Sequence, residues 1–551
     1  MNEQLLYEQW VKQSLYTEDL EAISTNVQEI QDSFHQQLQF GTGGLRGKLG
    51  PGTNRMNTHT IRLVAEGLAR QIEQQGEVAK MRGVVIAYDT RHFSQDFGYE
   101  TAGVLAAHGI QSYVFKESRP TPELSFAVRY LAAYAGVVIT ASHNPKQYNG
   151  FKVYGEDGAQ LTPQFANDIV AHMQAVDSIF DIPNLSRSQL QSSDLCVEIL
   201  EKLDDAYLQA LSKIQLNKNG KKDMGIVYTP IHGAGLEPTI RGLQNFGFTN
   251  VHLLQQQAVQ DGDFPTVIYP NPEEAEAFKL AMKLGKEVSA QLLLATDPDA
   301  DRLGVAVLVD GAYKLLTGNQ LGALLLDYIL SAQPAEPNAA MIKTIVTSEL
   351  GAAVAQKYGV ATVNTLTGFK YIAEKIAEWE LTKEHKFIFG YEESYGYLVS
   401  DVVRDKDAVQ IALLTAEMAA YYAATGKTLV DVLTALYEEH GFYQEALISL
   451  TFEGMEGQQK ITSIMEAFRK QPPKRFADIA VRKMEDYLTE SINGLPQADV
   501  IKFILEDDSW ICVRPSGTEP KCKFYIGVKT ESLLESEQKI EQLKSALQQW
   551  A

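Results

Sequence analysis

The sequence predicts an α/β protein in four parts: three similar α/β domains followed by a smaller α+β domain. Short apolar segments alternate with helical patterns along most of the chain, and three such segments follow one another closely near its C-terminal end. The length of 551 residues also suggests several domains, because about 150 residues per domain gives roughly four. We expect the domains to cover residues 1–214, 215–311, 312–440 and 441–551.

The first domain is predicted from three apolar segments that have the composition of buried strands. They cover residues 83–88, 110–115 and 135–140. Such continuous apolar strands indicate a sheet that helices cover on both faces. Between the first two segments, residues 94–108 have a helical pattern, with Ser94 as the expected N-cap and Gly109 as the stop.

The alternation resumes after a polar stretch at residues 215–223, which we interpret as a linker. A helix is expected at 272–286, and another begins near residue 531. The expected strands of the last three domains cover residues 225–229, 251–254, 291–295, 341–346, 361–363, 386–389, 500–505, 510–513 and 522–528.

Composition and charge exclude some classes of function. The chain carries 49 basic and 70 acidic residues, a formal charge of −21. Such a surface repels phosphate backbones, so we expect neither nucleic acid nor a membrane as partner. The three cysteines have no metal or disulfide spacing, and no basic region followed by an apolar stretch opens the chain. We therefore expect a cytoplasmic protein, a monomer by default with a dimer left open.

The first candidate site follows the apolar segment that ends at residue 140. The sequence there is Thr-Ala-Ser-His-Asn-Pro at 140–145, which places Ser142 at a strand exit, where open α/β sheets bind ligands. An ordinary Ser/Asn/Pro turn is the plain alternative. A serine-hydrolase elbow is excluded because residues 140 and 144 are not glycine. Shortly after, Asn149-Gly150 predicts a turn that brings Lys152 back towards the serine.

The second candidate is the acidic loop Asp297-Pro298-Asp299-Ala300-Asp301-Arg302, which also follows an expected strand. Three carboxylates at alternate positions repel one another unless a cation lies between them, and oxygen ligands favour magnesium or calcium. An EF-hand loop requires glycine at its sixth position and glutamate at its twelfth. It is excluded because those positions are Arg302 and Leu308 here. An aspartyl-phosphate phosphatase, with Asp299 or Asp301 as nucleophile, remains an alternative at this point.

Further clusters suit an anionic sugar ligand. Residues 40–47 are rich in glycine and include Arg46, whose guanidinium is a fork for an oxyanion. Residues 391–396 offer carboxylates and hydroxyls to sugar hydroxyls, and residues 404–407 form a charge cluster typical of a helix start. Residues 514–521 combine a guanidinium, two hydroxyls and a turn, which suits a phosphate dianion.

In this order, the clusters resemble the α-D-phosphohexomutase superfamily, which includes phosphoglucomutases and phosphomannomutases. The matching motifs are a phosphoserine loop at 140–145, a metal loop at 297–302, a sugar loop at 392–394 and a phosphate loop at 514–518. With the glycine-rich loop, the resemblance runs from residue 40 to residue 521. The segments 41–47 and 367–370 are most similar to the branch of bacterial phosphoglucomutases and eukaryotic phosphopentomutases.

The resemblance implies four domains around a central cleft and a role for each motif. Ser142 would carry the phosphoryl group and, with Asp297, Asp299 and Asp301, ligate Mg²⁺. The other implied catalytic residues are Arg46, His143, Lys152, Arg302 and Lys406. The implied sugar-binding residues are Thr367, Gly368, Glu392 and Ser394, and the implied phosphate-binding residues are Arg514, Ser516, Gly517 and Thr518.

The implied reaction interconverts α-D-glucose 1-phosphate and glucose 6-phosphate, with glucose 1,6-bisphosphate as intermediate and activator. Phosphopentomutase and phosphomannomutase activities are the alternatives within the superfamily. Tyr391 stands where many members have glycine, and we expect it to narrow the sugar site. A sugar-phosphate phosphatase and an inactive sugar-phosphate sensor are the rivals from other classes.

Overall fold

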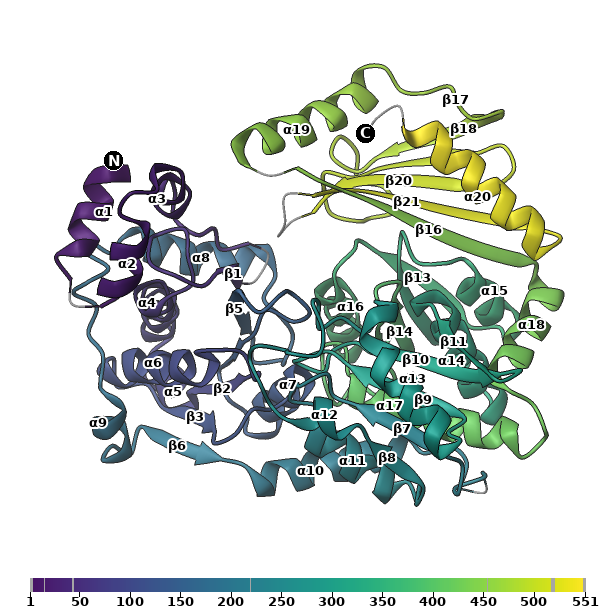
Figure 1. The fold of residues 1–551 in the computed structure, drawn as a ribbon, viewed down its shortest axis with the longest axis horizontal. Helices are drawn as coiled ribbons and strands as arrows, with labels where there is room; N and C mark the ends of the chain where they lie inside the picture. Colours follow the sequence, from purple (N-terminus) through teal and green to yellow (C-terminus); the bar gives the residue numbers. More distant parts are fainter. Residues whose placement is uncertain are drawn as a thin grey trace. The chain divides into compact units, whose positions relative to one another are not determined.

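The chain folds into two compact units (Figure 1). The computed structural model describes all residues except 1–2, 14, 42–43, 219, 453, 517–520 and 549–551. Unit 1 comprises Met1–Leu315 and Gly396–Tyr421, and unit 2 comprises Leu316–Tyr395 and Tyr422–Ala551. No helix in the described part of the chain is long and apolar enough to cross a bilayer.

The first sheet of unit 1 has six strands in the order β1-β5-β4-β2-β3-β6. Every residue of β2 and β4 is buried, as expected for strands covered on both faces. The strands are β1 (Gly44–Lys48), β2 (Val84–Tyr88), β3 (Ser112–Phe115), β4 (Ala135–Ile139), β5 (Tyr148–Tyr154) and β6 (Cys196–Ile199). The helices are α1 (Glu3–Val11), α2 (Thr17–Ile23), α3 (Val27–Phe34), α4 (Thr58–Gln74), α5 (Glu77–Arg82), α6 (Ser94–Ala107), α7 (Thr121–Tyr130), α8 (Pro163–Gln174), α9 (Arg187–Gln191), α10 (Glu201–Leu211) and η1 (Ser212–Ile214).

Two local predictions in this sheet are wrong. Ser94 is the first residue of α6 rather than its N-cap, because its hydroxyl donates to Asp89 (2.8 Å) and Phe93 takes the cap position. Asn149 and Gly150 lie within β5 and form no turn. Gly150 sits between β1 and β4, where a Cβ would lie 2.5 Å from the Thr140 carbonyl oxygen, so glycine here permits close strand packing.

The second sheet of unit 1 has the order β11-β10-β9-β7-β8. Its strands β9 and β10 are antiparallel, and the acidic loop joins them. The helix expected at 272–286 begins later, with a 3₁₀ turn, η2 (Ala275–Phe278), before α13 (Lys279–Val288). The remaining elements of unit 1, of which β15 is not a strand of this sheet, are β7 (Ile226–Thr229), α11 (Leu236–Asn245), β8 (Val251–Leu253), α12 (Gln255–Ala258), β9 (Leu292–Thr296), β10 (Leu303–Val309), β11 (Ala312–Leu316), β15 (Gly396–Leu398) and α17 (Ala408–Ala423).

Unit 2 begins with three parallel strands in the order β13-β12-β14. These are β12 (Ala339–Thr344), β13 (Ala361–Thr365) and β14 (Lys386–Glu392), with helices α14 (Gly318–Ala332), α15 (Leu350–Lys357), α16 (Phe369–Thr382) and α18 (Leu429–His440).

The C-terminal part of unit 2 is an antiparallel sheet in the order β16-β21-β20-β19-β18-β17, so the predicted α+β domain is confirmed. Its apolar face packs on two helices through residues such as Phe468, Phe503 and Leu543, while Trp510 packs beside Leu366 on the other face. The elements are β16 (Phe442–Thr451), α19 (Gly454–Lys470), β17 (Arg475–Phe476), β18 (Ile479–Asp486), β19 (Ile501–Leu505), β20 (Trp510–Pro515), β21 (Lys521–Thr530) and α20 (Leu533–Leu547).

Candidate active site

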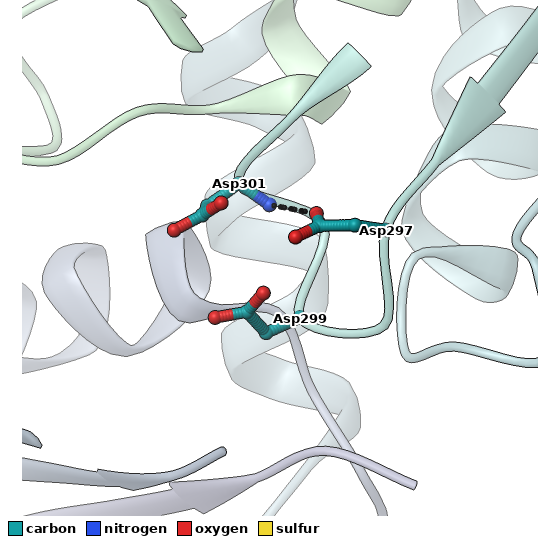
Figure 2. Close-up of side chains that lie close together, drawn as sticks. All are labelled: Asp297, Asp299 and Asp301. Carbon is teal, nitrogen blue, oxygen red and sulfur yellow. Dashed lines mark hydrogen bonds between the residues drawn. The ribbon is translucent and has the colours of Figure 1, made fainter. Parts of the chain in front are cut away.

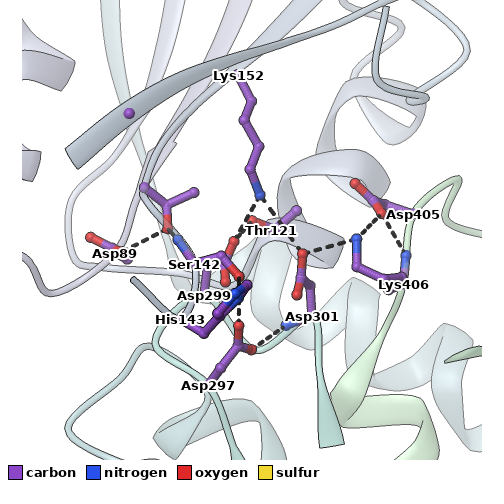
Figure 3. A network of polar contacts seen from close by, with 12 residues as sticks. Asp89, Thr121, Ser142, His143, Lys152, Asp297, Asp299, Asp301, Asp405 and Lys406 are labelled. Carbon is purple, nitrogen blue, oxygen red and sulfur yellow. Dashed lines mark hydrogen bonds and ion pairs between the residues drawn. The ribbon is translucent and has the colours of Figure 1, made fainter. Parts of the chain in front are cut away.

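The loop after β4 holds Ser142 in a constrained position (Figure 3). Ser142 has a positive φ of 51° and is only 3% exposed. Its hydroxyl donates to Asp297 Oδ2 (2.8 Å), and His143 Nδ1 lies 3.1 Å from Ser142 Oγ. Thr140 Oγ1 accepts a hydrogen bond from the Ser142 amide (2.8 Å). The predicted nucleophile and the predicted metal loop therefore meet, although 155 positions separate the two residues.

A fully buried arginine that sequence analysis passed over fixes this loop. The Arg91 guanidinium donates to the main-chain carbonyls of Ser142 (2.5 Å), Asn144 (2.5 Å), Pro145 (2.9 Å) and Tyr148 (3.1 Å). Its Nε donates to Asp89 Oδ2 (3.1 Å), an oxygen that also accepts from the Thr140 hydroxyl. The sequence signal that could have found Arg91 is its position. Residues 89–91 directly follow β2, and β2 pairs in parallel with β4, so the segments after both strands lie at the same edge of the sheet.

The acidic loop brings three buried carboxylates together (Figure 2). One oxygen from each of Asp297, Asp299 and Asp301 lies within 4.8 Å of the others. Oδ1 of Asp299 and Oδ1 of Asp301 are buried and have no hydrogen-bond partner in the described part of the chain. Hard, unsatisfied carboxylate oxygens in this grouping fit a magnesium ion. The loop is closed by Asp297 Oδ1, which accepts from the amides of Asp301 (3.1 Å) and Arg302 (3.0 Å).

Burial and neighbouring charges act differently on two of these acids. Burial, together with the charges of Asp299 and Asp301, raises the pKa of Asp297 well above its usual range. Burial also acts to raise the pKa of Asp299, but Lys152 and a hydrogen bond from Thr121 outweigh it, and the pKa is lowered. Lys152 and Thr121 therefore favour the ionised form of Asp299.

Two predicted lysines supply the compensating charge (Figure 3). Lys152 Nζ lies 3.1 Å from Asp299 Oδ2 and 3.7 Å from Asp301 Oδ2. Lys406 Nζ lies 3.0 Å from Asp301 Oδ2 and 2.9 Å from Asp405 Oδ1. Lys406 comes from the segment Gly396–Tyr421, which packs in unit 1 with the acidic loop.

Thr121 and Asp405 are two site neighbours that sequence analysis did not assign. Thr121 begins α7 and donates its hydroxyl to Asp299 Oδ2 (2.8 Å). Asp405 accepts a hydrogen bond from the Tyr154 hydroxyl (2.7 Å), and that contact fixes the carboxylate beside Lys406. No local motif signals either contact, since they join segments 178 and 251 positions apart.

The two predicted arginines of unit 1 are held by different partners. Arg46 lies on β1, which pairs with β5, and its Nη1 donates to Asn144 Oδ1 (2.8 Å) beside the serine loop. Arg302 pairs with Glu273, and its Nε lies 3.9 Å from Asp301 Oδ1. The Glu273 contact was not predicted.

The predicted sugar loop lies at the end of β14 in unit 2. Glu392 Oε1 accepts a hydrogen bond from the Gly368 amide (2.7 Å), which joins the two predicted sugar motifs. Glu393 instead accepts hydrogen bonds from Thr344 (3.3 Å) and Thr347 (3.2 Å). Ser394 is half-buried.

The prediction that Tyr391 narrows the sugar site is wrong. Its side chain is fully buried between two helices of unit 2. A Cβ at Gly322 of α14 would lie 2.3 Å from the Tyr391 ring, and a Cβ at Gly351 of α15 would lie 2.3 Å from its hydroxyl oxygen. The two glycines therefore make room for the ring within the core.

The predicted phosphate loop is described in part. Arg514 is the fifth residue of β20, and its Nε is buried without a hydrogen-bond partner among the described residues. The Ser516 amide donates to the Lys521 carbonyl (2.8 Å) and continues the pairing of β20 with β21. Gly517 and Thr518 lie outside the described residues.

Four family models match the chain in sequence order. They are the phosphoglucomutase/phosphomannomutase alpha/beta/alpha domains I (residues 37–179), II (205–309) and III (317–440), and the C-terminal domain (448–542). Four such domains in this order define an α-D-phosphohexomutase, an isomerase that transfers a phosphoryl group. Within that superfamily, the chain belongs to the phosphoglucomutase/phosphomannomutase family.

Curated relatives agree with this assignment, and solved structures share the fold. The chain is 38% identical over 545 residues to a phosphoglucomutase of Staphylococcus haemolyticus, covering 96% of this chain and 98% of the relative. It is 40% identical over 525 residues to one of Staphylococcus aureus, covering 93% of each. A putative phosphomannomutase structure from Thermus thermophilus shares the fold with a TM-score of 0.68 (24% identity; 92% of this chain, 99% of that one). The Paramecium parafusin structure shares the fold with a TM-score of 0.71 (17% identity; 93% of this chain, 96% of that one).

Arg91→Lys tests what orients the serine loop. Lysine keeps the positive charge but cannot reach all four carbonyls, so we expect kcat to fall about tenfold to a hundredfold, because a misplacement near 1 Å can cost about a hundredfold. KM should change much less. Steady-state kinetics check this, with Arg55→Lys as control, since Arg55 is also buried and ion-paired, but its partners are Glu29 and Asp32 rather than the serine loop. A wild-type kcat for Arg91→Lys would contradict the assignment.

Proposed function

We propose that this enzyme interconverts α-D-glucose 1-phosphate and glucose 6-phosphate through a phosphoserine at Ser142 and a glucose 1,6-bisphosphate intermediate. The observation that carries the proposal is the 2.8 Å contact between the Ser142 hydroxyl and Asp297 of the buried acidic triad. The curated relatives that match nearly the whole chain are named phosphoglucomutases, which supports glucose as the sugar.

The triad suits phosphoryl transfer, which depends on positioning and charge neutralisation more than on covalent activation. Asp297, Asp299 and Asp301 would hold Mg²⁺, which neutralises charge on the phosphate when bound. Lys152 and Lys406, already paired with the acids, add positive charge where the phosphoryl oxygens would lie. Arg46, held beside the serine loop by Asn144, supplies a guanidinium fork for the same oxygens.

Residues of unit 2 would bind the rest of the substrate. Thr367, Gly368, Glu392 and Ser394 would contact sugar hydroxyls, and the hydrogen bond between Gly368 and Glu392 supports their acting together. Arg514, with Ser516, Gly517 and Thr518, would hold the phosphate that is not reacting. A mutase needs such a second site because its bisphosphate intermediate must present each end in turn, whereas a phosphatase does not.

Glucose fits the proposed sugar loop better than ribose does. A carboxylate that accepts from two neighbouring hydroxyls favours an equatorial pair, which glucose and mannose both present at positions 3 and 4. A ribose phosphate is a smaller furanose and would leave buried polar groups unpaired. A reducing cytoplasm suits the enzyme, because its three cysteines are free thiols.

Ser142→Ala tests the nucleophile. We expect turnover to be lost and the fold to remain, because one hydroxyl contributes little to stability. After incubation with glucose 1,6-bisphosphate, intact-protein mass spectrometry should show one added phosphate on the wild type and on the control Ser463→Ala, but none on Ser142→Ala. An active Ser142→Ala enzyme would refute the proposal.

Removal of the metal tests the triad. Chelation should abolish activity and Mg²⁺ should restore it, while Asp299→Asn should weaken Mg²⁺ binding in a calorimetric titration. The control is Asp205→Asn, which changes an exposed acid paired with Arg241. Full activity after exhaustive chelation would exclude a magnesium role.

A panel of sugar 1-phosphates tests the substrate. An unpaired buried polar group costs about 1–3 kcal/mol, so we expect kcat/KM for glucose to exceed that for ribose by roughly tenfold to a hundredfold. Mannose should lie between them, since it differs from glucose only at position 2. If ribose equals or exceeds glucose, the enzyme is a phosphopentomutase.

A further inference from the structure

Unit 2 contains a buried lysine that forms no ion pair with an acid among the described residues. Lys370 lies in the first turn of α16 and is 6% exposed. Its Nζ has no hydrogen-bond partner and lies 4.9 Å from the centroid of the Tyr371 ring. Glu374 is the acid whose charge acts on it, without an ion pair between them. A buried ammonium without a partner is costly, so its retention calls for an explanation.

Other unpaired donors belong to the same region. Thr367 Oγ1 and Thr365 Oγ1, just before α16, are buried and have no hydrogen-bond partner. Arg514 Nε is unpaired in the same way, and the guanidinium is close enough to act electrostatically on the Tyr371 hydroxyl. Tyr371 therefore has the Lys370 ammonium against its ring and the charge of Arg514 acting on its hydroxyl.

The balance of donors and acceptors identifies the missing partner. Among the described residues, Lys370 Nζ, Arg514 Nε and two threonine hydroxyls have no acceptor, while Glu392 already accepts from the Gly368 amide. A neutral sugar hydroxyl does not neutralise two cations. A phosphate dianion does, because it offers several strong acceptor oxygens and two negative charges.

We infer that Lys370 is a phosphate-binding residue of unit 2, acting with Arg514 and Thr367 on the phosphate of the sugar phosphate that is not reacting. The inference rests on the proposed function and deepens it, since none of the predicted motif roles includes Lys370. Because this phosphate is held equally before and during transfer, the contact should contribute to KM rather than kcat.

Lys370→Met and Lys370→Gln test this inference, with Lys375→Met as the matched control. Lys375 is on the same helix and pairs with Glu378 at the surface. A charge-assisted contact is lost, so we expect KM for glucose 1-phosphate and glucose 6-phosphate to rise on the order of tenfold to a hundredfold. The kcat of both variants should stay within about threefold of the wild type, and the control should match it throughout.

Three further measurements separate binding from a structural role. The urea midpoint of Lys370→Met should equal or exceed that of the wild type, because an unpaired buried charge is removed. Inorganic phosphate should inhibit the wild type competitively and Lys370→Met more weakly, which separates the phosphate group from the sugar as the ligand.

Burial lowers the pKa of Lys370 to about 8, against the opposing charge of Glu374, so wild-type KM should rise above pH 8 as the ammonium deprotonates. Tyr371 and Arg514 belong to the same region, so the increase of KM above pH 8 is assigned to Lys370 only if it is absent in Lys370→Met.

Each outcome bears on one of the two proposals. Unchanged KM values in active Lys370→Met and Lys370→Gln enzymes overturn the inference, as does a rise for only one isomer. A lowered urea midpoint with unchanged phosphate inhibition would assign Lys370 a structural role and also overturn it. The absence of mutase activity in the wild type would instead refute the proposed function.

Discussion

The mutual repulsion of three buried carboxylates is the constraint on which the rest of unit 1 depends. Two unit charges 4 Å apart interact by about 4 kcal/mol at an effective dielectric constant of 20. Asp297, Asp299 and Asp301 are all nearly inaccessible to water, so the protein itself must offset this repulsion. It does so with two lysines and with a hydroxyl from the start of α7, which come from distant segments. Bringing those segments together also assembles the site.

The serine loop meets the acidic loop because both leave the ends of central strands. Ser142 follows β4 and Asp297 follows β9, so each is placed by a sheet rather than by a surface loop. The positive φ of Ser142 and the carbonyls that point towards Arg91 show that the loop is held in one conformation. This constraint suits the role proposed for Ser142, which would both accept and donate a phosphoryl group at one place.

The candidate site residues of the two units differ in how their charges are balanced. In unit 1, Lys152 and Lys406 are paired with acids. In unit 2, Lys370 Nζ and Arg514 Nε are buried without hydrogen-bond acceptors. The first arrangement leaves carboxylate oxygens available to a cation, and the second leaves cations available to an anion. A metal and a phosphate are the complementary ligands that we propose for the two groups.

Sequence alone predicted the fold class, and it pointed to Ser142 and the three aspartates that the structure brings together in the candidate site. Apolar segments such as 83–88 and 135–140 became β2 and β4, because continuous burial leaves a strong local signature. Ser142 and the acidic loop were recognisable because their chemistry lies within six consecutive residues. Ser94, Gly150 and Tyr391 were misassigned because their roles depend on neighbours from other strands and helices.

Only the tertiary structure decided which separate segments meet. Arg91 belongs to no recognisable motif, yet it holds the serine loop through main-chain carbonyls that any sequence would offer. Thr121 reaches Asp299 across 178 positions, and Tyr154 reaches Asp405 across 251. Such contacts are set by strand order and helix packing. A sequence specifies a residue's chemistry locally, whereas the neighbour that satisfies a buried charge is chosen by the fold.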